Sequence, residues 1–273
     1  MSGRLDIRDH AALAAEGWRL GGQLCGACRT YHRLWGTLRL AGIVNGMRAD
    51  TEVLTPLLAE LLTDGAQVLL AGAADPGQLE LLIDAAAGRR LKVTVADLCP
   101  TPLALFRRLD LPPSVELRTA ELDLTRLEDV AAYDLILSHG MLPFVGAQGQ
   151  ARLLQRLRRA LKPEGRLIVI LRTSPPTPPG QEHALQAAWL RRARALLAQT
   201  PLPAPEAEME PLLRAFAVER LSRAAPTDDP AELERGLVDG GVEVERRIRS
   251  GQSTTLEIAG RLHARQGHVF VCR

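Results

Sequence analysis

A glycine turn and an acidic residue, each at the end of an apolar segment, are the residues that could do chemistry in this sequence. The turn Gly72-Ala73-Ala74-Asp75-Pro76-Gly77 follows QVLLA, and Asp97 ends LKVTVAD twenty residues after Gly77. A carboxylate at that position accepts hydrogen bonds from both hydroxyls of a ribose. The turn keeps the first and third glycines of G-x-G-x-x-G, but Ala74 replaces the second and disfavours close approach of a pyrophosphate. The pattern therefore favours an adenosine ligand without a pyrophosphate over NAD or FAD.

Strand-like and helix-like patterns alternate around these two sites. Apolar strand patterns cover 67–72, 91–97, 115–119, 133–139 and 166–171, and helical patterns cover 78–87, 101–109 and 151–161. Such alternation predicts a parallel sheet with helices on both faces. Residues 242–249 and 267–273 add two strand patterns after further helices. We therefore expect an α/β fold with a Rossmann-like, doubly wound sheet of seven strands in the order 3-2-1-4-5-7-6, with strand 7 antiparallel.

The N-terminal part of the chain has a different character. Its segments carry helical patterns and no strand pattern. Asp50 or Thr51 is expected to cap the helix that begins in DTEVLTPLLAELL. We expect a helical cap or lid over residues 1–64 and a ligand-binding domain over 65–273.

The composition favours a protein that acts on small molecules. The 34 basic residues are nearly balanced by 32 acidic ones, which disfavours a nucleic-acid surface. No apolar run approaches the length of a membrane span, and the polar start MSGRLDIRDH is unlike a signal peptide. The four cysteines fit a reducing compartment better than a disulfide scaffold. We expect a cytoplasmic protein with no nucleic-acid or membrane partner, and a homodimer is left open.

The spacing of Cys25, Cys28 and His32 raises the question of a metal site. A structural zinc site needs four ligands, and neither a second C-x-x-C nor a histidine pair accompanies these residues at zinc-finger spacing. Cys99 is expected to pack beside an adenine, and Cys272 to pack in the core. We therefore expect no metal, although binding by Cys25 and Cys28 is left open.

The order of the motifs resembles that of the class I S-adenosylmethionine-dependent methyltransferases, over roughly residues 65–172. The first two motifs are VLLAGAADPG and VTVADLCP, and TAELDL follows the third strand. The most specific pair is YDLILSHGMLPF and LKPEGRLIVI. The acid that usually stands two residues before the first glycine is Leu70 here. The amino group of the cofactor therefore needs another partner.

The resemblance implies S-adenosyl-L-methionine as the cofactor. Residues at the carboxyl ends of the first four strands would surround it: Gly72, Ala73, Ala74, Asp97, Leu98, Glu121, Leu122, Asp123, Ser138 and His139. Asp97 would hold the ribose hydroxyls, and Leu98 would lie against the adenine. The acid at the adenine would be Glu121 or Asp123, depending on the length of the turn.

A lid over the cofactor is expected from residues 25–48. Tyr31 and Trp35 share one face of a helix, with His32 between them. An aromatic ring stabilises a nearby cation such as a sulfonium by roughly 0.5–2 kcal/mol. The alternative is that these rings are ordinary core contacts. Tyr31, His32 and His139 are the candidate catalytic residues, and His139 or His32 would act as a base.

The expected function is methyl transfer to a small molecule, whose carboxylate Arg39 or Arg48 would hold. Three alternatives remain. Intramolecular attack on the aminobutyryl arm of the same cofactor would release methylthioadenosine. A nicotinamide-dependent oxidoreductase is disfavoured by Ala74. A non-catalytic cofactor-binding subunit is disfavoured by Asp97 and by the aromatic residues near Tyr31.

Overall fold

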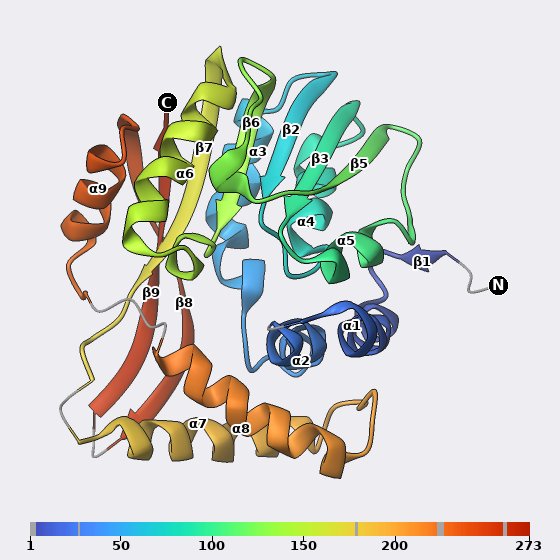
Figure 1. Cartoon of the computed structure of the whole chain (residues 1–273), viewed down its shortest axis with the longest axis vertical. Coiled ribbons are helices and arrows are strands. Elements are labelled where there is room, and N and C mark those ends of the chain that lie inside the picture. The colour runs from blue at the N-terminus through green and yellow to red at the C-terminus, as the bar shows by residue number, and fades with distance from the viewer. Residues whose placement is uncertain (1–3, 27, 178–179, 223–226, 259–260) are drawn as a thin grey trace.

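A mixed sheet of seven strands forms the centre of the molecule, and its strand order is the one predicted. The structure is a computed structural model that describes residues 4–26, 28–177, 180–222, 227–258 and 261–273 (Figure 1). The sheet order is β5 (Val115–Glu121), β3 (Leu91–Asp97), β2 (Ala66–Ala71), β6 (Tyr133–His139), β7 (Leu161–Thr173), β9 (Arg261–Cys272) and β8 (Val244–Ile258). In chain order this is 3-2-1-4-5-7-6. The strand β9 runs antiparallel to both β7 and β8, whereas the other pairs are parallel. The predicted fold class is confirmed.

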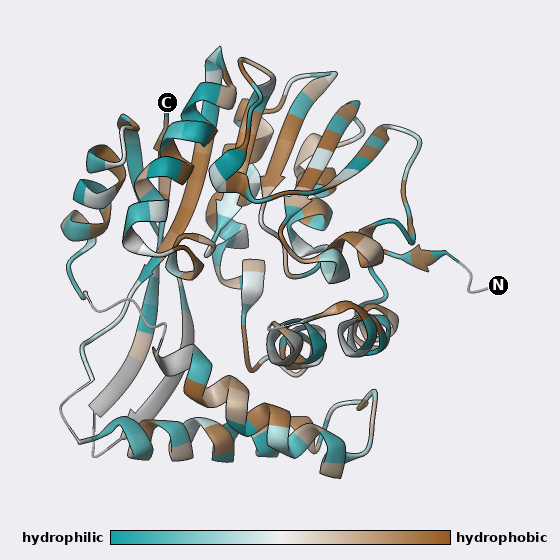
Figure 2. Cartoon of the chain, in the orientation of Figure 1, coloured by the Kyte–Doolittle hydropathy of each residue, from teal (hydrophilic) through white to brown (hydrophobic). Residues whose placement is uncertain are grey.

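Alternate residues of the strands feed two separate apolar cores. Val68 and Leu70 pack with α3 (Thr51–Leu61), α4 (Gly77–Ala86) and α5 (Pro100–Phe106) on one face. Leu69 and Ala71 pack with α6 (Ala147–Ala160) and α9 (Pro230–Asp239) on the other. Figure 2 shows the central strands as largely hydrophobic, as expected for a sheet buried on both faces. The helices thus hold the strand ends in fixed positions.

A third apolar core joins four helices that lie beyond the carboxyl ends of the parallel strands (Figure 1). They are α1 (His10–Leu24), α2 (Arg29–Leu40), α7 (Glu182–Leu197) and α8 (Glu206–Ser222). Trp189 and Phe216 from the later pair pack with Leu34 and Leu38 from the earlier pair. The cap over the sheet is therefore made from two distant parts of the chain. Within the described residues, no helix is long and apolar enough to cross a membrane.

Three local expectations were wrong. The N-terminal part does contain a strand, β1 (Leu5–Asp6), which pairs with β4 (Leu109–Asp110). The helix expected over 101–109 ends at Phe106, because the chain then turns into β4. Asp50 does occupy the N-cap position of α3, but its side chain makes no capping hydrogen bond and points instead into the molecule. The domain boundary at residue 64 stays a prediction, and α3 packs with α4 on the sheet.

Candidate functional site

A cavity of about 1050 Å³ opens where the carboxyl ends of β2, β3, β6 and β7 meet the cap helices. Crevices at this edge of a doubly wound sheet are the usual ligand sites of such folds. Eleven of the residues predicted from sequence line it: Tyr31, His32, Trp35, Gly72, Ala73, Ala74, Asp97, Leu98, Leu122, Asp123 and His139. Two predicted residues, Glu121 and Ser138, do not line it. The sheet therefore brings most of the predicted residues together around one space.

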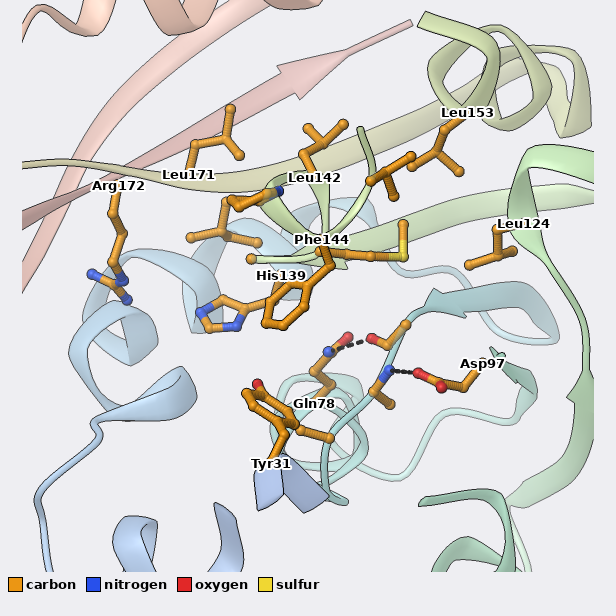
Figure 3. A pocket seen from close by; sticks show the side chains of 18 of the residues that line it. Tyr31, Gln78, Asp97, Leu124, His139, Leu142, Phe144, Leu153, Leu171 and Arg172 are labelled. Carbon is orange, nitrogen blue, oxygen red and sulfur yellow. Dashed lines mark hydrogen bonds between the residues drawn. The ribbon is translucent and has the colours of Figure 1, made fainter. Parts of the chain in front are cut away.

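Backbone geometry fixes the turn after β2. Gly72 has φ of +76°, and a Cβ there would lie 2.6 Å from Sδ of Met141. The backbone conformation therefore favours glycine, and a larger residue would also displace the side chain of Met141. Its carbonyl accepts a hydrogen bond of 3.0 Å from Nε2 of Gln78, a buried residue of α4 (Figure 3). This bond orients the amide, and Oε1 of Gln78 is left with no partner among the described residues.

The carboxylate of Asp97 is held by two backbone groups. The N–H of Ala73 donates to Oδ2 at 3.0 Å (Figure 3). The N–H of Cys99 donates to Oδ1 at 2.7 Å. Burial raises the pKa of Asp97, although these two hydrogen bonds oppose the rise. Each carboxylate oxygen has a second lone pair that can accept from a ligand. Asp97 is thus an acceptor in a fixed orientation at the wall of the cavity.

The residues that follow β3 and β5 form one end of the cavity. Leu98 is 71% exposed and lines it. Asp123 also lines it, and its Oδ1 accepts hydrogen bonds from the backbone and hydroxyl of Thr125 at 3.0 and 2.7 Å. Glu121 is the last residue of β5 and is exposed to solvent. Of the two acids considered from sequence, Asp123 is the one at the cavity.

Aromatic rings from three segments meet at the cap side of the cavity. Tyr31 stacks on Trp35 with a centroid separation of 5.0 Å and on Phe216 of α8 at 5.9 Å. Phe144, in the turn after β6, meets Tyr31 edge to face at 5.3 Å. All four residues line the cavity. The rings thus form an aromatic wall of the cavity. Nε1 of Trp35 donates a hydrogen bond of 2.8 Å to Asp75, which connects this wall to the turn after β2.

A buried carboxylate orients His139 at the opposite wall. Nε2 of His139 lies 3.3 Å from Oδ2 of Asp50, whose side chain is fully buried. Asp50 also accepts hydrogen bonds from Ser250 at 2.5 Å and from Arg172. The side chain of Arg172 lines the cavity (Figure 3). Burial raises the pKa of Asp50, but His139 and the charge of Arg172 outweigh it, and the net pKa is lowered. Asp50 therefore stays ionised at neutral pH and fixes the imidazole ring.

A second arginine on this wall is half-buried, and its Nε is buried without a hydrogen bond to any described residue. Arg265 of β9 lines the cavity, and this nitrogen has no partner among the described residues. Burial and the neighbouring charge of Arg172 both lower its pKa. By contrast, Arg39 is paired with Asp75 at 3.0 Å, and Arg48 lies 3.5 Å from His10. The two arginines at the cavity are thus Arg172 and Arg265, in place of the pair expected from sequence.

Comparison with known proteins identifies the domain. A family model described as a methyltransferase domain matches residues 75–169. The chain therefore contains a methyltransferase domain over these residues. S-adenosylmethionine is the cofactor of this family, as the sequence predicts. A comparison with curated proteins found no match.

Solved methyltransferase structures share the fold at low sequence identity. The CurJ carbon methyltransferase aligns with a TM-score of 0.53 and 14% identity, over 96% of this chain and 67% of that one. A SAM-dependent methyltransferase from Leishmania major aligns with a TM-score of 0.52 and 11% identity, over 98% and 87% of the two chains. The trans-methyltransferase CalH, solved with SAH, has 20% identity and a TM-score of 0.43, over 79% of this chain and 55% of CalH. This chain thus spans about half the length of CalH.

The candidate site contains residues that the sequence did not predict. Arg172 lies near the end of the fifth strand of the parallel order, and its place at a carboxyl strand end was a usable signal. Phe144 lies inside a motif that was recognised, but its position in the cavity depends on η3 (Leu142–Phe144). Asp50 and Arg265 gave no signal, because only the packing of distant elements brings them to His139 and Arg172.

Four cysteine and histidine side chains converge at the edge of the methyltransferase cavity. Sγ of Cys99 lies 3.5 Å from Sγ of Cys25 and 3.3 Å from Sγ of Cys28. Nδ1 of His32 lies 3.5 Å from Sγ of Cys25. His32 therefore faces the sulfur atoms. Cys99 packs against Cys25 and Cys28 of the cap. From the sequence we expected Cys99 to pack beside an adenine, and this contact with the cap was not predicted.

Proposed function

We propose that this protein transfers the methyl group of S-adenosylmethionine to a small anionic acceptor, with His139 as the base. The observation that carries this proposal is one continuous cavity with a ribose-type carboxylate, Asp97, and a basic wall that contains His139 and Arg172. Its volume of about 1050 Å³ accommodates a cofactor and a small acceptor together.

The adenosine half of the cofactor fits the end of the cavity near β3 and β5. Asp97 is oriented by two backbone N–H groups and has lone pairs left for the two ribose hydroxyls. The exposed Leu98 offers an apolar surface to the adenine, and Asp123 offers an acceptor for its amino group. These roles agree with the choice of Asp123 over Glu121.

Gln78 offers the amino group of the cofactor a partner in place of the acid that Leu70 replaces. The family's acid at that position is absent, and Leu70 itself is fully buried in the sheet. Oε1 of Gln78 is a buried acceptor with no partner in the described part of the chain. Nε2 of the same amide donates a hydrogen bond to the carbonyl of Gly72, which fixes the position of Oε1. An unpaired buried acceptor costs about 1–3 kcal/mol, so a ligand donor at this point is favoured. We assign Gln78 to the amino group of the methionine moiety.

The chemistry requires alignment more than acid or base strength. When bound, S-adenosylmethionine supplies an electrophilic methyl group on a sulfonium. The rings of Tyr31, Trp35, Phe144 and Phe216 line the cavity and stabilise a cation beside them. Closure of the cap over the bound cofactor would exclude water from this space. The residues therefore hold donor and acceptor in line rather than forming a covalent bond to either.

The acceptor end has the charges for an anion and the base for its nucleophile. Arg172 donates to Asp50, and Arg265 has a buried Nε that no described residue bonds. A carboxylate placed between them receives charge-assisted hydrogen bonds. His139 takes the proton of a hydroxyl or amine acceptor as it attacks, and Asp50 stabilises the imidazolium that forms.

One observation favours a second candidate, in which the cofactor itself is the substrate. A neutral amide at Gln78 stabilises an ammonium group less than a carboxylate does. The free amine could then attack the γ-carbon of its own side chain. The C–S bond breaks, methylthioadenosine leaves as a neutral thioether, and the amine proton passes to a base. This reaction and methyl transfer give different products from the same binding site.

Product analysis distinguishes the two reactions. The purified full chain is incubated with methyl-labelled S-adenosylmethionine and a panel of small hydroxy and amino acids. Methyl transfer gives S-adenosylhomocysteine and a labelled acceptor, whereas cyclisation gives labelled methylthioadenosine. We expect the former, and His139→Ala should lower kcat by about 10²–10⁴-fold. Titration calorimetry with S-adenosylhomocysteine and with NAD tests binding separately, and preference for NAD would overturn the proposal.

A further inference from the structure

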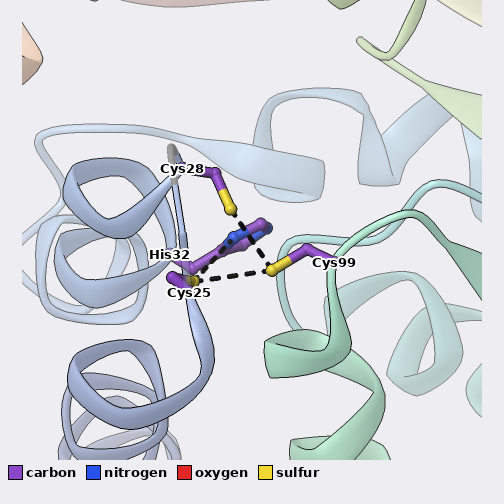
Figure 4. A group of neighbouring side chains, drawn as sticks. All are labelled: Cys25, Cys28, His32 and Cys99. Carbon is purple, nitrogen blue, oxygen red and sulfur yellow. Dashed lines mark hydrogen bonds between the residues drawn. The ribbon is translucent and has the colours of Figure 1, made fainter.

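We propose that Cys25, Cys28, His32 and Cys99 bind one Zn²⁺ ion, which connects the lid to the turn that follows Asp97. The four side chains converge in Figure 4, and one ligand atom from each lies within 4.8 Å of every other. This inference is independent of the proposed function, because the metal content of the protein can be measured without a methyl acceptor.

The distances between the ligand atoms match a single tetrahedral ion. Zn–S bonds of about 2.3 Å and Zn–N bonds of about 2.0–2.1 Å separate two sulfurs by roughly 3.8 Å and a sulfur from a nitrogen by roughly 3.6 Å. The sulfur of Cys99 lies 3.5 Å from that of Cys25 and 3.3 Å from that of Cys28. The sulfur of Cys25 lies 3.5 Å from Nδ1 of His32. These three separations differ from the tetrahedral values by a few tenths of an ångström, and the other three are at most 4.8 Å, so shifts of no more than about 1 Å centre the ion.

A disulfide and an iron–sulfur cluster fit these four side chains less well than zinc does. The sulfur atoms are much farther apart than the roughly 2.05 Å of a disulfide, which would also leave one cysteine and the histidine unused. An iron–sulfur cluster needs room for several iron and sulfide atoms between its cysteines, and these ligand atoms are too close together for that. Three soft thiolates and one imidazole are a common ligand set of structural zinc.

The surrounding chain provides the outer support that metal sites need. Oγ1 of Thr101, a buried residue, lies 2.8 Å from Sγ of Cys25 and can donate to a thiolate. The backbone N–H of Cys99 is fixed by Asp97. Cys25 and Cys99 are 4% and 7% exposed, so their sulfurs are shielded from water. Such outer hydrogen bonds orient the ligands and restrict their motion.

The position of the ligands indicates a structural role. Cys25 ends α1, Cys28 precedes α2 and His32 lies in its first turns, whereas Cys99 precedes α5 on the far side of the contact. Four protein ligands complete a tetrahedron and leave no open position for a substrate. The ion would therefore join the start of the lid to the turn after β3. The sequence did not predict this site from zinc-finger spacing, because Cys99 stands 71 residues after Cys28.

Metal analysis of the intact chain tests this proposal. The protein is purified under reducing conditions after expression with added zinc, and zinc is counted by mass spectrometry. We expect close to one zinc per chain in the wild type and in Cys272→Ala, which removes the buried cysteine outside the cluster. We expect the zinc to be lost in Cys99→Ser and Cys28→Ser. Zinc at full stoichiometry in Cys99→Ser would overturn the proposal.

Replacement by Co²⁺ keeps the test valid if the variants fold poorly. Wild-type protein in which Co²⁺ replaces zinc should show the absorption bands of tetrahedral thiolate coordination. Removal of the metal should also increase hydrogen exchange in residues 97–101 without abolishing the sheet. A wild type that takes up neither metal, or an intact mass two hydrogens lighter with no metal, would overturn the proposal in favour of a thiol cluster or a disulfide.

Discussion

The backbone N–H of Cys99 donates a hydrogen bond of 2.7 Å to Oδ1 of Asp97, so the cysteine cluster and the carboxylate that we propose for the ribose share one turn of the chain. The other oxygen, Oδ2, accepts from Ala73 in the turn after β2. Asp97 thus links the lid contact on one side to the glycine turn on the other. A disturbance at the cysteines is expected to reach the cofactor site through this carboxylate.

Asp97→Ala should weaken the binding of S-adenosylhomocysteine at least tenfold. Charge-assisted hydrogen bonds to the two ribose hydroxyls contribute on the order of 1.5–3 kcal/mol, and alanine removes both. Isothermal titration calorimetry measures the change directly.

Glu121→Gln is the matched control, because Glu121 pairs in register with Asp97 on the next strand but is exposed to solvent outside the cavity. Its dissociation constant should equal that of the wild type. Equal affinity in both variants would mean that the ribose binds elsewhere.

The lid should become more protected when the cofactor site is filled. Amide hydrogen exchange across residues 28–48 should slow on addition of S-adenosylhomocysteine, because ligand contacts hold the ring wall of Tyr31 and Trp35 closed. Trp35→Phe keeps a ring but removes the hydrogen bond to Asp75, so this protection should decrease.

Phe270→Leu serves as a comparison, since Phe270 is a fully buried ring of the sheet outside the cap. It should lower stability and leave the ligand-dependent protection unchanged. Identical exchange with and without ligand in the wild type would show that the rings are core packing, the alternative considered from sequence.

The sequence predicted the fold because each strand carries its own local signal. The runs that became β2, β3 and β6 are apolar, short and bounded by turns, and their order leaves one favoured topology. Residues at their carboxyl ends, such as Asp97 and His139, could therefore be assigned to one edge of the sheet. The same reasoning was less successful where a two-residue strand depends on a distant partner, as for β1 and β4.

The acceptor side was harder to predict, because its residues come from unrelated elements. Asp50 precedes α3, Arg265 lies in the last strand, and both approach His139 and Arg172 only through the packing of the whole domain. Asp50 also has the residue type of a helix cap, which gave a sufficient local explanation for it. Only the burial of its side chain and its contact with His139 reveal the orienting role.

Asp50→Asn should lower stability in a pH-dependent way. The folded pKa of Asp50 is below its ordinary value, because His139 and Arg172 outweigh the effect of burial. Its contribution is therefore fully present above the unfolded pKa of about 3.9 and is lost as pH falls through the lower folded pKa. The loss on mutation should be about 3–5 kcal/mol at pH 7, because Arg172 is left without its buried partner.

Chemical denaturation at a series of pH values between neutrality and the acid range measures this difference. Asp64→Asn is the control: its pKa is lowered to about 2 by the hydrogen bond from Arg90, but the pair is exposed and should affect stability little. A difference between wild type and Asp50→Asn that stays constant down to the lowest pH would argue against an ionised Asp50.

Arg265→Met should stabilise the protein without ligand, whereas Arg172→Met should destabilise it. Within the described residues, Arg265 has a buried Nε without a hydrogen bond, and it lies near a like charge, an arrangement that costs several kcal/mol. Methionine keeps much of the side-chain volume and removes that cost. Arg172, by contrast, is paired with the buried Asp50, and its loss removes the guanidinium charge and leaves that carboxylate only His139 and Ser250. Thermal unfolding should give a higher Tm for Arg265→Met, by roughly 2–4 °C for each kcal/mol gained.

Arg265→Met should also lose turnover with an anionic acceptor, as expected when stability is given up for function at a binding site. A lower Tm in both variants would show that packing satisfies Arg265, and the assignment of an anion to this wall would then fail.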